Sequence, residues 1–148
     1  MGLSVDQRII SLNVSRLPDI VALLEKCDLP FEDCNEHLEN FSGIISGRQL
    51  VAIGALQIKG SVALLRSIAV LPENRGQGLA TLMTQHLLGM ARSKHVRELY
   101  LLTETAELYF ARFGFSLVER DSVPDAIKTT QQFETLCPDS AQVMRLYL

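Results

Sequence analysis

The sequence feature that most constrains the fold is a strand–loop–helix unit in the middle of the chain. The stretch Val62–Leu71 is almost continuously apolar, and only Arg66 and Ser67 interrupt it. A strand that is apolar on both faces needs cover on both sides, which favours the middle of a sheet with helices on either side. A glycine-containing loop follows, and over Gly78–Lys94 apolar residues recur at helical spacing. The unit predicts a layered α/β fold.

Other patterns predict the elements around this unit. Short β-prone runs predict strands over Arg8–Val14, Gly43–Ser46, Gln49–Ile58, Val96–Thr103, Phe115–Glu119 and Gln142–Leu148. Cap residues and helical spacing predict a helix capped by Ser15 with Pro18 in its first turn, and helices over Phe31–Phe41, Glu104–Arg112 and Pro124–Leu136. The 148 residues contain no linker and no repeat, so we expect one domain over residues 1–148.

Composition excludes several classes of function. Lys and Arg total 14 against 17 Asp and Glu, and the net charge of −3 gives no general electrostatic reason to bind nucleic acid or an anionic membrane. The three cysteines, Cys27, Cys34 and Cys137, form neither a disulfide framework nor a CxxC zinc pair, so no metal is expected. The sequence has no apolar run near the roughly 20 residues of a membrane span and no signal-peptide pattern. We therefore expect a cytoplasmic protein.

The loop between the apolar strand and the helix carries the chemical information. Gly76 and Gly78 let the backbone turn its N–H groups inward, and a helix N-terminus with its unpaired donors favours an anion such as a phosphate. Arg75 adds a cation. Because Leu79 follows Gly78, the nucleoside-triphosphate P-loop pattern is absent. Because Thr81 stands where the third glycine belongs, the dinucleotide pattern is incomplete. A tight turn without a ligand is the alternative.

Two segments resemble a known family. Residues 75–80, Arg-Gly-Gln-Gly-Leu-Ala, match the Arg/Gln-x-x-Gly-x-Gly/Ala signature of the GNAT superfamily of acyl-CoA-dependent N-acetyltransferases, and Val70-x-Pro72 before them is typical of it. Residues 109–115, Tyr-Phe-Ala-Arg-Phe-Gly-Phe, resemble the Tyr-x-x-x-x-Gly-Phe segment of the same family. Finer matches at residues 29–33, 65–70, 99–103 and 133–141 are similar to the acetyltransferase domain of N-acetylglutamate synthases and to a small branch linked with arsenic resistance.

The resemblance implies a fold and a co-substrate. The fold is a mixed, mostly antiparallel sheet of six or seven strands with a central splayed parallel pair, here Leu64–Val70 and Leu99–Thr103. The co-substrate is acetyl-CoA. Backbone atoms of Ile68 and Val70 would hold its pantetheine arm, and the Ile68 N–H would donate to the thioester oxygen. The implied cofactor-binding residues are Ile68, Ala69, Val70, Arg75, Gly76, Gln77, Gly78, Leu79, Ala80, Thr81 and Tyr109.

The resemblance also implies catalytic roles, with alternatives for each. Tyr109 occupies the family position that protonates the departing thiolate, or it simply packs. Glu104 is one candidate for the base that deprotonates the amine. His37, His86 and a bound water are others, and His86 lies on the apolar helix stripe, which is more typical of a core histidine. Arg66 is charged inside a strand that is expected to be buried, so it clamps a substrate carboxylate or similar oxyanion, forms an internal ion pair, or lies at an exposed strand edge.

These residues predict transfer of an acetyl group to the primary amine of a small molecule, an amino acid or an amino-acid analogue, by direct attack in a ternary complex. Acetylation of a protein N-terminus or lysine is a second hypothesis, and a non-catalytic acyl-CoA-binding module is a third. The apolar strand Val143–Leu148 is compatible with a homodimer.

Overall fold

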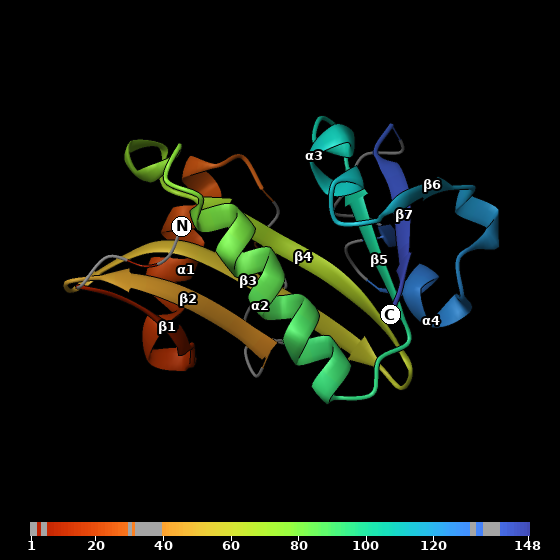
Figure 1. The fold of residues 1–148 in the computed structure, drawn as a ribbon, viewed down its shortest axis with the longest axis horizontal. Coiled ribbons are helices and arrows are strands. Elements are labelled where there is room, and N and C mark those ends of the chain that lie inside the picture. Colours follow the sequence, from red (N-terminus) through yellow and green to blue (C-terminus); the bar gives the residue numbers. More distant parts are fainter. Residues whose placement is uncertain (1–2, 4–5, 30, 32–39, 131–132, 135–139) are drawn as a thin grey trace. The chain divides into compact units, whose positions relative to one another are not determined.

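The chain forms a mixed seven-stranded sheet with helices. The computed structural model describes residues 3, 6–29, 31, 40–130, 133–134 and 140–148 (Figure 1). The strand order is β1-β2-β3-β4-β5-β7-β6, in which the β4–β5 pair is parallel and the pairs β1–β2, β2–β3, β5–β7 and β6–β7 are antiparallel. This confirms the predicted α/β fold with a mostly antiparallel sheet and a parallel pair.

The elements have the following bounds. The strands are β1 (Gln7–Ser11), β2 (Phe41–Ser46), β3 (Gln49–Lys59), β4 (Val62–Val70), β5 (Glu98–Thr103), β6 (Ser116–Val118) and β7 (Gln142–Tyr147). The α-helices are α1 (Leu17–Lys26), α2 (Leu79–Ser93), α3 (Glu107–Ala111) and α4 (Asp125–Lys128). Short 3-10 helices cover Val14–Arg16, Pro72–Asn74 and Arg120–Ser122. Among the described residues, no helix is both long enough and apolar enough to cross a membrane.

Contacts divide the chain into two compact units. Unit 1 comprises residues 1–56 and 67–90, and unit 2 comprises residues 57–66 and 91–148. The division falls inside β3, β4 and α2, so each of these elements contributes to both units.

Unit 1 packs α1 and α2 on strands of the sheet. Helix α1 buries Ile20, Leu23 and Leu24, the apolar face that its helical spacing predicts. Helix α2 lies along β3 (Figure 1), and a Cβ atom on Gly54 would lie 2.7 Å from side-chain atoms of both Met83 and Leu87. Glycine at this position therefore allows the close approach of α2 to β3.

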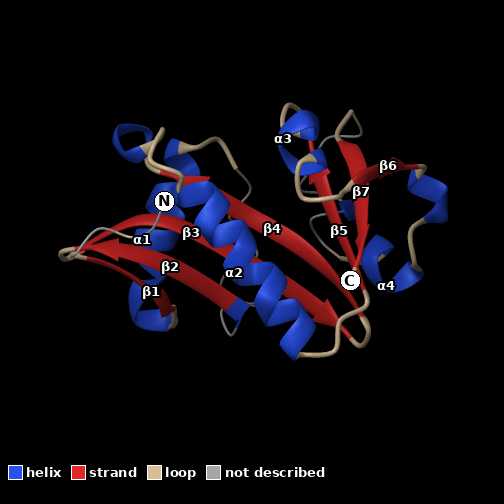
Figure 2. Cartoon of the chain, viewed as in Figure 1, coloured by secondary structure: helices blue, strands red, loops and turns tan. Residues whose placement is uncertain are grey.

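Unit 2 packs α4 on a face of its strands. Its buried cluster contains Leu64 from β4, Tyr100 from β5, Val143 from β7, and Val123 and Ile127 from the segment of α4. Figure 2 shows α4 beside β7, as these contacts require. The alternation along β5 that places Tyr100 and Leu102 on this face follows the two-residue period of a strand.

Several predicted boundaries are wrong at the N-terminus. Strand β1 ends at Ser11, where Val14 was expected, and the residue that caps the following turn is Asn13 and not Ser15. The Asn13 side chain accepts a hydrogen bond from the Ser15 amide at 3.0 Å, so a 3-10 helix precedes α1. Pro18 lies in the first turn of α1 as predicted.

Later boundaries shift for similar local reasons. Helix α3 begins at Glu107, not at residue 104, because the Thr103 hydroxyl accepts the Ala106 amide at 2.9 Å and forms a turn first. Helix α4 ends at Lys128, and the Thr130 hydroxyl donates to the Ile127 carbonyl at 2.7 Å just beyond it. Of the helix predicted over residues 124–136, residues 131–132 and 135–136 lie outside the described part. Of the helix predicted over residues 31–41, Phe41 belongs to β2 and residues 32–39 lie outside the described part.

Candidate functional site

Strand β4 has an unusual backbone conformation immediately before Ile68, whose N–H is the predicted donor to the thioester oxygen. Ser67 has φ +61°, the left-handed region, although it lies within the strand. A residue other than glycine in this region costs about 1–3 kcal/mol, so the surrounding packing must hold it there. Ser67 is buried and immediately precedes Ile68. The sequence showed only a polar interruption of the apolar run and gave no sign of this conformation.

The parallel pairing of β4 with β5 is short. Its register joins Val62 to Glu98, Ala63 to Leu99 and Leu64 to Tyr100. Both strands continue beyond this register, β4 to Val70 and β5 to Thr103. The register ends where the resemblance predicts that the pair diverges.

The loop before α2 has the backbone conformation that the glycine pattern predicts. Gly76 and Gly78 both have φ +80°, which glycine adopts without the steric cost of a Cβ. The Arg75 amide donates to the Pro72 carbonyl at 3.3 Å, so the first of the predicted amides is engaged within the turn. Within the described part of the chain, the amides of residues 76–80 find no hydrogen-bond acceptor. These amides, at the start of a 15-residue helix, form an arrangement that suits an anion.

The Arg75 side chain contacts protein groups, although the sequence predicted it as a cation for a bound anion. Its Nε donates to the Val70 carbonyl at 3.1 Å, and its Nη2 lies 3.5 Å from Cys27 Sγ. Cys27 Sγ in turn lies 3.5 Å from the same Val70 carbonyl. The guanidinium therefore bonds the last residue of β4, and contact with a phosphate stays a prediction.

The second predicted motif forms an aromatic cluster in unit 2. The Tyr109 ring on α3 makes edge contacts with Phe110, at 5.1 Å between centroids, and with Phe113, at 5.4 Å. The guanidinium of Arg112 lies 5.7 Å from the Tyr109 centroid. Tyr109 is half-buried, so these contacts orient its ring while part of the residue stays accessible.

Gly114 ends this motif for a backbone reason. Its φ is +99°, and a Cβ there would lie 3.1 Å from a methyl group of Leu146. The turn that Gly114 permits leads into Phe115, which is buried. The Gly-Phe part of the motif is therefore structural in this chain, which leaves Tyr109 as the motif's candidate for chemistry.

The candidate bases lie in different surroundings. Glu104 is exposed, and its Oε1 accepts a hydrogen bond from the Ser140 hydroxyl at 3.3 Å. His86 is half-buried on α2, and its Nε2 lies 3.2 Å from the buried Ser42 hydroxyl. This contact agrees with the interpretation of His86 as a core histidine. His37 lies outside the described residues.

The β3–β4 hairpin of unit 2 buries two polar side chains. Arg66 is 3% exposed and interacts within the chain, and Gln57 is 5% exposed. The Gln57 Oε1 atom is buried without a hydrogen-bond partner among the described residues. Counting back from the two-residue turn at residues 60–61 places Gln57 opposite Leu64, so Gln57 and Arg66 share one face of the hairpin. Gln57 was not among the residues predicted from sequence, because one glutamine in a strand carries no distinctive pattern.

The candidate residues fall into two groups. Ile68, Ala69, Val70 and the loop of residues 75–81 belong to unit 1, so the predicted coenzyme-binding backbone lies within one unit. Arg66, Glu104 and Tyr109 belong to unit 2. No group of three His, Cys, Asp or Glu side chains gathers as a metal site within the residues described.

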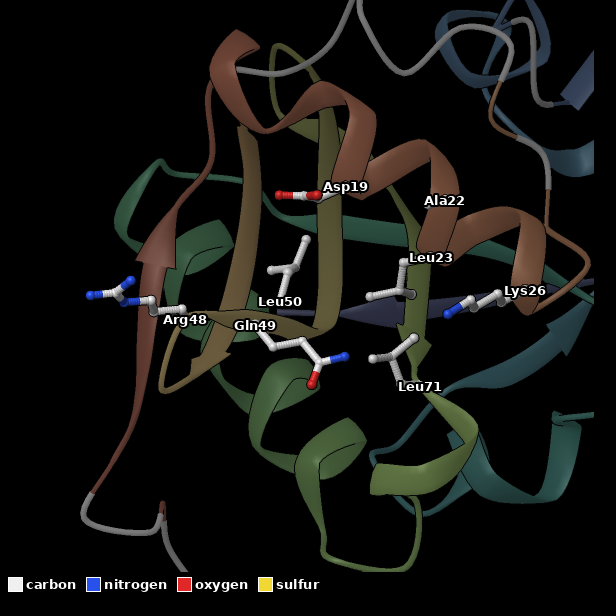
Figure 3. Close-up of a pocket in the computed structure, with 8 residues that line it drawn as sticks. All are labelled: Asp19, Ala22, Leu23, Lys26, Arg48, Gln49, Leu50 and Leu71. Carbon is white, nitrogen blue, oxygen red and sulfur yellow. The ribbon is translucent and has the colours of Figure 1, made fainter.

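Unit 1 also contains a pocket of about 420 Å³ between α1 and the start of β3. Leu23, Leu50 and Leu71 gather at its centre (Figure 3). Asp19, Ala22, Lys26, Arg48 and Gln49 complete its lining. None of these residues is among the predicted site residues.

Known proteins share this sequence pattern and fold. The model of the acetyltransferase (GNAT) family matches residues 12–115. An amino-acid acetyltransferase of Mycobacterium tuberculosis (strain ATCC 25618 / H37Rv) is 31% identical over 90 residues, which are 60% of this chain and 48% of that protein. The match thus spans about half the length of this curated relative.

Two solved structures illustrate the fold. Rv2747 from Mycobacterium tuberculosis, in complex with CoA, has a TM-score of 0.80 and 21% identity, with 95% of this chain and 99% of that chain covered. N-acetylglutamate synthase from Neisseria gonorrhoeae, in complex with coenzyme A and N-acetyl-glutamate, has a TM-score of 0.83 and 19% identity, with 99% of this chain and 36% of that chain covered. The family match covers well over half of the sequence and agrees with both motifs, so the chain belongs to the acetyltransferase (GNAT) family.

Proposed function

We propose that this chain is an acetyl-CoA-dependent N-acetyltransferase that acts on the primary amine of a small molecule, either an amino acid or an amino-acid analogue. The loop before α2 is the observation that carries the proposal. Its glycines at φ +80° and its amides without acceptors among the described residues suit a diphosphate, an anionic part of the coenzyme. The family to which the chain belongs supports the same co-substrate.

The residues of this chain divide the binding of the coenzyme between two backbone segments. Amides from Gly76 onward would hold the diphosphate, and the backbone of Ile68 and Val70 would hold the pantetheine arm. The left-handed conformation of Ser67 immediately precedes Ile68 and supports the proposal that the Ile68 N–H would donate to the thioester oxygen. Acetyl-CoA supplies the activated acetyl group, and a preorganised backbone donor of this kind lowers the barrier by about 3–4 kcal/mol.

Proton transfer needs an acid for the departing thiolate and an acceptor for the amine proton. Tyr109 carries a phenol hydroxyl, which is a proton donor, on a ring that Phe110 and Phe113 orient. Glu104 is an exposed carboxylate that can accept a proton from the substrate ammonium and so produce the neutral amine that attacks, as can a water molecule. The amine then attacks the thioester directly, without an acyl-enzyme.

The hairpin of β3 and β4 supports an amino acid as the acceptor. Arg66 carries a guanidinium, a cation whose N–H geometry suits a carboxylate. On the same face, the Oε1 of Gln57, partnerless among the described residues, is an acceptor for an ammonium N–H. A cation and an acceptor on one face of the hairpin match the two ends of an α-amino acid. The amino-acid acetyltransferase of Mycobacterium tuberculosis is a relative with this substrate class in its name.

Release of coenzyme A thiol from acetyl-CoA, across a panel of amino acids and their phosphinic and arsonic analogues, tests the proposal. Turnover with at least one of these amines is expected, and its absence with all of them would contradict the proposed acceptor class. Retention of coenzyme A in equilibrium dialysis without turnover would favour a non-catalytic binding module.

Two hairpin variants test the acceptor site. Arg66→Ala and Gln57→Leu should raise the KM of the amine about tenfold or more, the effect of removing one hydrogen bond to a charged group, and should change the KM of acetyl-CoA much less. Equal effects on both substrates would indicate a structural role for the hairpin residues. Circular dichroism of each variant checks that the fold is retained.

A further inference from the structure

Three segments of unit 1 converge on one carbonyl at the end of β4. The carbonyl oxygen of Val70 lies 3.1 Å from Arg75 Nε, which comes from the loop, and 3.5 Å from Cys27 Sγ, which follows α1. Arg75 Nη2 also lies 3.5 Å from Cys27 Sγ, so the three groups close a small ring of contacts. A guanidinium donor and a thiol on one main-chain oxygen fix the orientation of that peptide group.

The direction of this carbonyl follows from the neighbouring residue. The Leu71 amide donates to the Val51 carbonyl on β3 at 2.9 Å. In an extended chain the N–H and C=O of one residue point the same way, and those of the next residue point the opposite way. The N–H and C=O of Val70 therefore point away from β3, and Arg75 and Cys27 hold the residue from that side.

We infer that Arg75 is a positioning residue, which ties the loop to β4 through the Val70 carbonyl and is not the cation that binds the diphosphate. The inference rests on the proposed function, in which the Val70 backbone holds the pantetheine arm. By holding the carbonyl of the Val70–Leu71 peptide, Arg75 holds the end of β4 in place, and the Val70 N–H, one peptide earlier, lies on the same side of the strand. The Arg75 side chain therefore sets the distance between two backbone segments that would bind the same ligand, the Val70 backbone and the loop amides.

If Arg75 acts as a hydrogen-bond donor, one set of substitutions should preserve its role, and if it acts as a positive charge, another set should. Glutamine carries a side-chain N–H donor but no charge, and methionine has similar length but no donor. The signature that the loop resembles accepts Arg or Gln at this position, which suits a donor and does not suit a required positive charge. Arg75→Gln and Arg75→Met therefore form a matched pair.

The test uses two ligands that differ in the diphosphate. The KM of acetyl-CoA and the inhibition constant of pantetheine, which lacks the diphosphate, are measured for the wild type and both variants. Arg75→Met should weaken both ligands, each about tenfold, with a smaller change in kcat. Arg75→Gln should restore both constants to within about twofold of the wild type. Cys27→Ala should act in the same direction as Arg75→Met but more weakly, because a thiol is a weak donor.

The opposite pattern would overturn the inference. If Arg75→Gln and Arg75→Met raise the KM of acetyl-CoA equally while pantetheine binds as in the wild type, Arg75 contacts the diphosphate. Unchanged constants in both variants would also overturn it, since the Val70 contact would then be dispensable. A third result would show a purely structural role: both variants bind acetyl-CoA and pantetheine weakly, and the thermal unfolding midpoint of Arg75→Met falls greatly. Arg75→Gln would then fail to restore either constant. A wild-type protein that binds no acetyl-CoA would refute the proposed function instead.

Discussion

The contact between α2 and β3 offers a stability prediction whose sign the structure fixes. Gly54 on β3 faces α2, and a Cβ at this position would lie 2.7 Å from Leu87 Cδ1 and from Met83 Cγ. Carbon atoms in good contact are about 3.5–4.0 Å apart, so Gly54→Ala requires movements of about 1 Å. Met83 and Leu87 are both fully buried, so neither side chain can relieve the contact by moving into solvent without losing burial. Overpacking of this kind costs about 1–3 kcal/mol.

The net effect is smaller than the packing cost. Replacing a strand glycine with alanine recovers about 0.5–1 kcal/mol of backbone entropy. Taken at the middle of each range, the expected loss in the free energy of unfolding is about 1 kcal/mol, and its upper limit is about 2.5 kcal/mol. In a domain of this size, 1 kcal/mol corresponds to about 2–4 °C in the midpoint of thermal unfolding. Gly54→Ala should lower that midpoint by about 2–4 °C, and by no more than about 10 °C, in calorimetry or circular dichroism.

Gly89→Ala is the matched control. Gly89 lies on α2 and is exposed, and no atom lies within 4 Å of the position that a Cβ would occupy there. Here the same change of side chain adds only helix propensity, about 0.8–1 kcal/mol, and should raise the midpoint by about 2–4 °C. Two shifts of the same sign would refute the packing argument. Since α2 begins with the loop, Gly54→Ala should also raise the KM of acetyl-CoA, whereas Gly89→Ala should leave it unchanged.

Three further predictions concern the site and the core of unit 2. Tyr109→Phe should lower kcat about a hundredfold or more with little change in the KM of acetyl-CoA, and an unaltered kcat would remove Tyr109 as the acid. Gly78→Val should raise the KM of acetyl-CoA steeply, because φ +80° is strained for a β-branched residue, and calorimetry showing unchanged coenzyme binding would contradict this. Burial, followed by the hydrogen bond to Glu98, raises the pKa of Tyr100 from 10.0 to about 12. The folded state then holds the phenol proton more tightly than the unfolded state, so about 2–3 kcal/mol of stability is present below pH 10 and is lost between about pH 10 and 12. Urea unfolding over this range should show that loss in the wild type and not in Tyr100→Phe.

The sequence predicted elements best where a local rule decided the outcome. The Gly47 turn has φ +63° and joins β2 to β3 as the hairpin pattern indicated. The predicted start of a helix was wrong where a side chain accepts a hydrogen bond from a nearby backbone amide. Asn13 accepts the Ser15 amide and Thr103 accepts the Ala106 amide, and each bond inserts a turn before the helix. Several residue types can cap a helix, so the sequence alone did not decide between Asn13 and Ser15.

The conformation of Ser67 could not have been predicted from sequence. Serine has no intrinsic preference for φ +61°, and apart from Arg66 the residues around it in the chain are apolar and typical of a strand. Only packing of the whole fold can hold a buried serine in this region. The Gln57 Oε1, without a partner among the described residues, is a similar case, because burial of a polar atom depends on contacts distant in sequence.

Arg75 illustrates why a short sequence motif can predict the chemistry of a residue and still miss the atoms that the residue contacts. From the motif alone, an arginine beside a glycine loop at a helix N-terminus is expected to bind an anion. Its actual partners include Cys27, 48 residues earlier, which no property of the loop reveals. The anion site does not lose its basis, because the amides of residues 76–80 and the dipole of α2 supply positive potential without a formal charge. If the backbone carries the attraction, coenzyme binding should depend on the loop's conformation more than on its charge, and this is the difference that the Gln and Met variants of Arg75 measure.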